Sequence, residues 1–111
     1  MKNGPRKAAG LLIIWEFRVR TNQRKRFEEV YGQDGVWAMF FRTGSGYIRT
    51  ELLADPEDQQ RYFTLDFWNS RRAYEAFRRR NRDTYKRIDK ECESFTTSER
   101  LVGYFRLDKQ S

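Results

Sequence analysis

The chain has 111 residues, which is the usual length of one domain and is too short for two hydrophobic cores of ordinary size. Hydrophobic residues make up 38% of it and aromatic residues 16%, so large rings supply enough apolar surface for one core. A formal net charge of +7 favours nucleic acid, an anionic membrane or an acidic small molecule as a partner, without choosing among them.

The first predicted elements are an N-terminal arm, a strand and two short helices. Residues 1–10 are mostly polar or small, as expected of a flexible arm. Apolar and polar side chains alternate over residues 11–20, which predicts a strand with one apolar face. A helix follows it. The helical spacing of Trp37, Phe40 and Phe41 then predicts a second helical segment packed on the same surface.

The middle and end of the chain contain three more predicted strands and two helices. Residues 47–54 and 61–68 alternate in the same way and are joined by a short polar turn, which predicts a hairpin. Two helices follow, separated at Asn81, and residues 101–107 form the last strand. Residues 108–111 are a short polar tail.

These elements predict one domain over residues 11–107, of the α+β class. Their order, βαββαβ, is that of a ferredoxin-like fold with a four-stranded antiparallel sheet. Helices on one side of such a sheet bury only that side, so the composition of the other side indicates whether it meets water or a partner.

The two predicted sheet faces differ in composition. We assign to the helix side the strictly apolar positions Ile13, Trp15, Phe17, Val19, Phe63, Leu65 and Phe67. The open side then carries the large side chains Ile14, Tyr47, Tyr62, Trp68, Val102 and Tyr104, beside the charged residues Glu16, Glu51, Asp66, Arg18, Arg49 and Arg106. Such a face predicts a homodimer in which the open sheets of two copies meet and pair their charges. A solvated sheet with exposed aromatic residues is the alternative.

Several kinds of catalytic site are excluded by composition. Without histidine, the chain has no Ser-His-Asp triad and none of the usual zinc or haem ligand sets, and we expect no metal and no cofactor. A single cysteine, Cys92, excludes an internal disulfide and lies on an apolar helical stripe. No apolar run approaches the about 20 residues that span a bilayer. We therefore expect a cytoplasmic protein with no membrane partner.

One string of residues resembles a known family. Trp68-x-Ser70-x-x-Ala73-Tyr74 follows a hydrophobic strand and precedes Ala76-Phe77, and it is similar to the signature of antibiotic biosynthesis monooxygenase (ABM) domains of the dimeric α/β-barrel superfamily. Ser45-Gly46-Tyr47 opens the second strand where that family often has Pro-Gly-Phe or Pro-Gly-Tyr. The resemblance implies a ferredoxin-like subunit, a dimer of facing sheets, and a pocket between sheet and helices. It also implies a cofactor-independent monooxygenase acting on a small aromatic molecule.

The resemblance implies particular site residues. Trp68 and Tyr74 match pocket residues of the family, and Arg87 is an approximate match to an arginine on its later helix, which gives three candidate catalytic residues. We expect the substrate to be bound by Trp37, Phe40, Thr64 and Phe77. Thr64 lies on the third strand at the position where the cofactor-independent oxygenases of that family carry asparagine. Strand alternation places Trp68 opposite Phe67, whereas the pocket of the family lies on the helix side; a bulge would reconcile the two.

Two other functions remain open from the sequence. The first is a non-catalytic dimeric barrel that binds a small hydrophobic or anionic ligand, with Trp68 and Tyr74 serving only as core residues. The second is a nucleic-acid-binding module, for which the support is a group of basic residues on the later helices: Arg71, Arg72, Arg78, Arg79, Arg80, Arg82, Lys86 and Arg87. Nucleic acid is the less favoured partner, because the sheet lacks the aromatic RNA-binding motif and a solvated helical face explains the charge.

Overall fold

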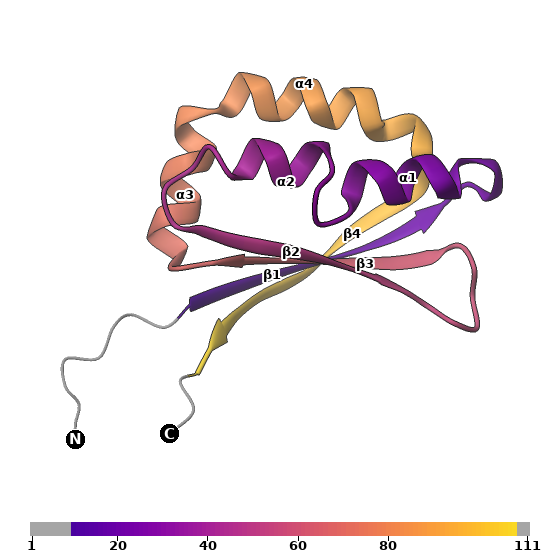
Figure 1. Cartoon of the computed structure of the whole chain (residues 1–111), viewed down its shortest axis with the longest axis horizontal. Coiled ribbons are helices and arrows are strands. Elements are labelled where there is room, and N and C mark those ends of the chain that lie inside the picture. Colours follow the sequence, from indigo (N-terminus) through magenta and orange to yellow (C-terminus); the bar gives the residue numbers. More distant parts are fainter. Residues whose placement is uncertain (1–9, 109–111) are drawn as a thin grey trace.

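The computed structural model describes residues 10–108, so the predicted arm and tail lie outside it except for Gly10 and Asp108. One layer of helices covers one side of a four-stranded antiparallel sheet with the strand order β2-β3-β1-β4 (Figure 1). The strands are β1 (Gly10–Val19), β2 (Tyr47–Ala54), β3 (Arg61–Trp68) and β4 (Thr96–Leu107). This arrangement is the predicted α+β, ferredoxin-like fold.

Four α-helices and two short 3-10 helices connect the strands on the covered side. They are η1 (Thr21–Gln23), α1 (Arg24–Tyr31), α2 (Val36–Phe41), α3 (Arg71–Arg80), α4 (Arg82–Cys92) and η2 (Glu93–Phe95). Helix α3 starts after Ser70, whose hydroxyl oxygen accepts a hydrogen bond from the Ala73 backbone N–H at 3.0 Å. None of the helices within residues 10–108 is long and apolar enough to cross a membrane.

The hairpin of β2 and β3 has the predicted bounds, but the predicted faces of β3 are wrong. Tyr62, Thr64, Asp66 and Trp68 are buried beneath the helices, and Phe63, Leu65 and Phe67 lie on the uncovered side. The assignment failed because it placed the most apolar face of β3 in the core, whereas the covered face includes polar groups. Trp68 therefore lies on the helix side without a bulge in β3.

Strand β4 differs from its prediction at two points. It begins at Thr96 rather than at Leu101. Its pairing with β1 also shifts register, since Gly103 is opposite Ile14 while Leu101 is opposite Trp15, which leaves Val102 as an extra residue. This bulge turns both Leu101 and Tyr104 toward the helices, although strict alternation would place residues three apart on opposite faces. Tyr104 was predicted on the open face and lies instead under the helices.

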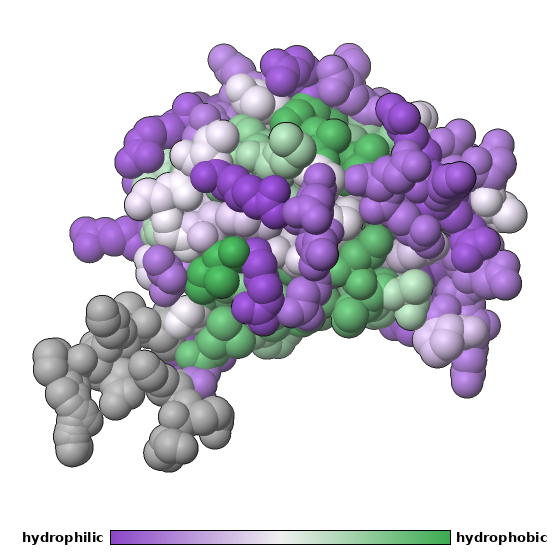
Figure 2. Space-filling view, in the orientation of Figure 1, coloured by the Kyte–Doolittle hydropathy of each residue, from purple (hydrophilic) through white to green (hydrophobic). Residues whose placement is uncertain are grey.

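The uncovered face of the sheet is largely apolar and carries a few paired charges. The register places on it Leu12, Ile14, Leu53, Phe63, Leu65, Phe67 and Phe105. Leu53 is 45% exposed and Phe105 43%, and Figure 2 shows hydrophobic side chains along the sheet side of the molecule. Glu16 lies among them and is paired with Arg61 at 2.8 Å and with Arg100. The face thus combines apolar surface with matched charges.

Replacing Gly46 tests the turn that joins α2 to β2. Gly46 has φ of 98°, and a Cβ there would lie 2.7 Å from the Cβ of Ala73 on α3. Both the left-handed backbone and the clash oppose a side chain, so we expect Gly46→Ala to lower the free energy of unfolding by about 2 kcal/mol. Urea denaturation at one fixed protein concentration measures this. The exposed neighbour supplies a control, Ser45→Ala, which we expect to change stability little.

Candidate functional site

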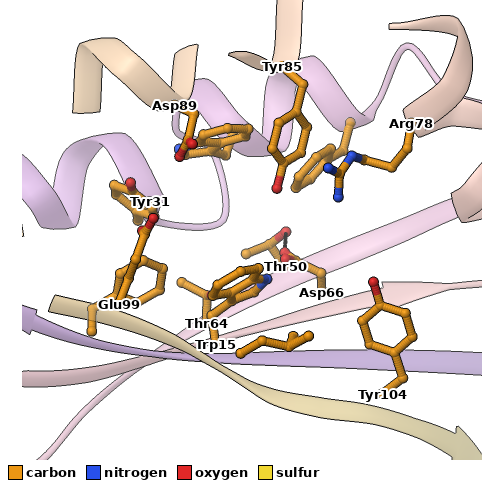
Figure 3. Close-up of a pocket in the computed structure, with 14 residues that line it drawn as sticks. Trp15, Tyr31, Thr50, Thr64, Asp66, Arg78, Tyr85, Asp89, Glu99 and Tyr104 are labelled. Atoms are coloured by element: carbon orange, nitrogen blue, oxygen red, sulfur yellow. Dashed lines mark hydrogen bonds between the residues drawn. The ribbon is translucent and has the colours of Figure 1, made fainter. Parts of the chain in front are cut away.

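A cavity of about 360 Å³ lies between the sheet and the helices (Figure 3). Its floor is formed by side chains from the strands, chiefly Trp15, Thr50, Thr64, Asp66, Leu101 and Tyr104. Its roof is formed by side chains from the helices, chiefly Tyr31, Trp37, Phe41, Arg78, Tyr85 and Asp89. Seven of the fourteen residues that line the cavity are aromatic and six are polar or charged, a combination suited to binding a small molecule that carries polar groups.

The space exists because short side chains occupy the centre of the sheet. Thr50 is opposite Asp66 on β3, and Thr64 lies between Leu52 and Trp15. At the ends of β3, in contrast, the fully buried rings of Tyr62 and Trp68 reach up to the helices. Large side chains at both ends and small ones between them hold the helices away from the centre of the sheet.

Asp66 is the buried carboxyl group of this cavity. It is only 8% exposed, and its Oδ1 accepts a hydrogen bond of 2.7 Å from the Thr50 hydroxyl, drawn as a dashed line in Figure 3. Because Thr50 has one hydroxyl proton, the 2.7 Å bond between its oxygen and Tyr47 must take its proton from Tyr47. Burial raises the pKa of Asp66 from 3.8 to about 6, and the Thr50 hydrogen bond opposes this rise. Asp66 is thus suited to accept a proton near neutral pH.

Arg78 is the cation of the cavity. Its Nη1 donates a hydrogen bond of 2.7 Å to the Tyr74 hydroxyl, and its guanidinium carbon lies 3.8 Å from the centre of the Tyr85 ring. These two contacts fix the orientation of the guanidinium group and leave other N–H donors available. Burial raises the pKa of Tyr85 to about 12, so its hydroxyl stays protonated at neutral pH.

The two ends of the cavity differ in charge. Figure 3 places Asp89 and Glu99 at one end, near Tyr31, and Arg78 with Tyr104 at the other. Partial burial raises the pKa of both Asp89 and Glu99. Repulsion from Glu93 raises both pKa values further, and repulsion from Asp89 adds to that of Glu99. A bound molecule with a charged group is therefore oriented by this difference.

The predicted site residues fall into three groups. Trp37 and Thr64 line the cavity. Trp68, Tyr74, Phe77 and Phe40 lie on the helix side but belong to the packed core beside it, and Arg87 is exposed on α4, 4.0 Å from Glu91. The structure thus brings the predicted aromatic residues together, while it leaves Arg87 in solvent. Their roles in binding and catalysis stay predictions.

The volume next to Trp68 is filled by other rings. The centre of the Trp68 ring is 5.5 Å from that of Tyr74, 5.3 Å from that of Phe77 and 5.8 Å from that of Phe41. Of these, only Phe41 also lines the cavity. The empty space therefore begins beyond Phe41, toward Trp15 and Tyr85, rather than directly at Trp68.

Sequence reasoning missed Asp66 and Arg78 as site residues, although each had a signal. Asp66 shares its face of β3 with Trp68, so accepting Trp68 as an inward residue would have turned the carboxyl inward too. Arg78 is four residues after Tyr74 and lies on the same face of α3. Over residues 10–108, no group of three or more histidine, cysteine, aspartate or glutamate side chains is placed to hold a metal ion.

Together, the fold and the cavity define a class: ferredoxin-like α+β domains with an aromatic chamber between the sheet and its helices. A family model described as antibiotic biosynthesis monooxygenase matches residues 11–90, and the chain belongs to this family. A search of curated proteins found no match.

Solved structures share the fold at low sequence identity. SnoaB of Streptomyces nogalater, described as a cofactor-independent oxygenase, is 18% identical with a TM-score of 0.74, over 94% of this chain and 97% of that chain. PA3566 of Pseudomonas aeruginosa is 14% identical with a TM-score of 0.64, over 96% and 100%. A conserved protein of Methanosarcina mazei is 12% identical with a TM-score of 0.68, over 92% and 96%.

Burial of Asp66 has a consequence for stability. Its pKa in the folded chain, about 6, is higher than its ordinary value of 3.8. The folded state therefore loses stability as the pH rises from about 4 to 6, and above pH 6 no further stability is lost from this group. Asparagine keeps an oxygen for Thr50 but carries no charge. We expect Asp66→Asn to raise the free energy of unfolding by on the order of 2 kcal/mol at pH 8 and by little at pH 4. Denaturant unfolding at the two pH values measures it; an equal effect at both would contradict the assignment.

Proposed function

We propose that the protein is a cofactor-independent monooxygenase that oxidises a small aromatic substrate bearing a phenolic hydroxyl. The observation that carries the proposal is the buried Asp66 carboxyl group facing an aromatic cavity in an ABM-family fold. The cavity volume, about 360 Å³, lies near the lower end of the about 300–1,000 Å³ of small-molecule sites and suits a compact fused-ring molecule. The likeness to SnoaB, described as a cofactor-independent oxygenase, supports the same reaction class.

In the proposed reaction, Asp66 acts as the general base. Its ionised carboxylate takes the phenolic proton, and the resulting electron-rich ring passes electrons to molecular oxygen. One oxygen atom enters a ring carbon, and the two hydrogens lost by the substrate leave with the other oxygen atom as water, which yields a quinone. The apolar walls keep bulk water away from the carbanion.

Arg78 stabilises the negative charge that forms on the substrate. Its guanidinium lines the same cavity and is held by the Tyr74 hydroxyl and the Tyr85 ring. In this scheme Tyr74 is a positioning residue, because it acts through Arg78. Trp68 supports the cavity wall through its contact with Phe41. We assign no step to Arg87.

Oxygen consumption tests the reaction. With a panel of hydroxylated anthrones and naphthols, we expect uptake by the protein above the spontaneous rate for at least one compound. Asp66→Asn removes the base, and we expect it to lower kcat by about 100-fold or more while the protein stays folded. Oxygen-electrode assays, with product identified by mass spectrometry, measure both effects. No uptake across the panel would favour the alternative of a non-catalytic binding protein.

Three further variants separate direct from indirect roles. Thr50→Val removes the hydrogen bond that opposes the rise in the Asp66 pKa, so we expect the acidic limb of the kcat/KM profile to move to higher pH. Tyr74→Phe frees Arg78 without removing it, and we expect a smaller loss than for Asp66→Asn. Trp68 only supports the cavity wall in this scheme. If Trp68→Phe abolished oxygen uptake as completely as Asp66→Asn, that assignment would be wrong, and Trp68 would be the better candidate for a catalytic residue.

We also propose that the protein is a homodimer formed through its uncovered sheet faces. The support is the apolar surface of β1 and β3, on which Glu16 already has its charge paired by Arg61 and Arg100. Burial of such a face removes apolar area from water without leaving an unpaired charge.

Placing a positive charge on the uncovered face of the sheet tests the dimer. Leu65 lies at the centre of the uncovered face, and we expect Leu65→Lys to weaken dimerisation by about 100-fold, because a lysine would be buried against the second copy. Met39 on α2, 60% exposed on the helix side, supplies the matched control Met39→Lys, which we expect to leave the dimer intact. Sedimentation velocity measures both. A monomeric wild-type protein at micromolar concentration would contradict the proposal.

A further inference from the structure

A second, smaller depression adjoins the aromatic cavity. It has a volume of about 160 Å³ and lies where α3 meets α4, lined by Arg78, Arg79, Arg82, Tyr85 and Lys86. We call it the basic cleft. Arg78 and Tyr85 line both the basic cleft and the aromatic cavity, so the two spaces meet at these side chains.

The cations of the basic cleft have no carboxylate partners within residues 10–108. Arg78, Arg79, Arg82 and Lys86 form none of the ion pairs found there. Other arginines of the same two helices do form pairs, as Arg71 does with Glu75 at 3.0 Å. Grouped like charges repel one another, and a bound anion relieves that repulsion.

The acidic side chains that line these two spaces all belong to the aromatic cavity. Asp66, Asp89 and Glu99 line the aromatic cavity, and no acidic side chain lines the basic cleft. An anionic group is therefore repelled by the carboxyl groups of the cavity and attracted to the cleft. A molecule whose ring occupies the cavity and whose negative group extends past Arg78 satisfies both regions.

We propose that the ligand of this protein is an aromatic molecule that carries an anionic substituent, with its ring in the aromatic cavity and its carboxylate or sulfonate group in the basic cleft. Arg78, held by Tyr74 and stacked on Tyr85, contacts both parts, while Arg82 and Lys86 contact only the anion. This inference rests on the proposed function in one respect, that the aromatic cavity is the substrate site. It deepens that function by naming the substrate class.

The test compares the binding of matched aromatic probes. The probes are 2-naphthol and 6-hydroxy-2-naphthoate, which share a ring system and differ in a carboxylate, titrated by their fluorescence at physiological salt. We expect the carboxylate to bind at least about tenfold more tightly, because hydrogen bonds from guanidinium and ammonium groups to a carboxylate are stronger than those between neutral groups. In the double variant Arg82→Gln/Lys86→Gln we expect most of this preference to be lost, with the remainder coming from Arg78, while the affinity for 2-naphthol is unchanged.

A control variant that loses one positive charge outside the cleft separates the cleft from the general positive charge of the protein. Lys90 is exposed on α4 but lies outside the basic cleft, and Lys90→Gln removes a charge from the same helix. We expect Lys90→Gln to keep the full preference for the carboxylate. Equal affinity of the two probes for the wild-type protein, or an equal loss in Lys90→Gln, would overturn the inference.

Binding and turnover distinguish this inference from the proposed function. If the carboxylate probe binds more tightly through the basic cleft but no compound supports oxygen uptake, the substrate class stands as a ligand class and the monooxygenase proposal fails. If neutral naphthols are oxidised and the carboxylate gives no gain in affinity, the reaction stands and the basic cleft is not part of the site. Inorganic phosphate as a competitor adds one check: displacement of the carboxylate probe but not of 2-naphthol supports the assignment of the anion to the cleft.

Discussion

The orientation of β3 is the constraint on which the rest of the structure depends. Successive side chains of a strand point to opposite faces, so placing Trp68 under the helices also places Asp66 and Thr64 there, and it sends Phe67 to the uncovered side. The same choice of orientation creates the cavity floor, buries a carboxyl group, and leaves an apolar outer face. The candidate site and the candidate dimer surface are therefore two results of one register.

This arrangement divides the molecule into a tightly packed part and a part that holds the cavity. Around Trp68, rings from β2, α2 and α3 fill all the volume and supply apolar burial. A few residues away, the small Thr50 and Thr64 leave an open chamber in which ionisation of Asp66 costs stability. Active sites commonly concentrate such unfavourable features and rely on well-packed neighbours to support them. Here the aromatic cluster fills that supporting role.

Much of the fold could be predicted from the sequence, because alternation and helical spacing are local properties of the chain. The bounds of β2 and β3 came from such patterns. The face of β3 could not be assigned by apolar content alone, because both faces carry large apolar side chains and the more apolar one lies on the uncovered side. The bulge at Val102 depends on pairing between strands far apart in sequence, and no local pattern indicated it.

The bulge in β4 also affects how such a site can change over evolution. Val102 is an extra residue in an edge strand, and it sets which of the following side chains point inward. Removing one residue at this point would exchange the inward and outward side chains of the strand segment beyond it, so Tyr104 would leave the chamber and its neighbours would enter. A single deletion at the sheet edge would then replace one wall of the chamber at once, whereas point substitutions alter it one side chain at a time.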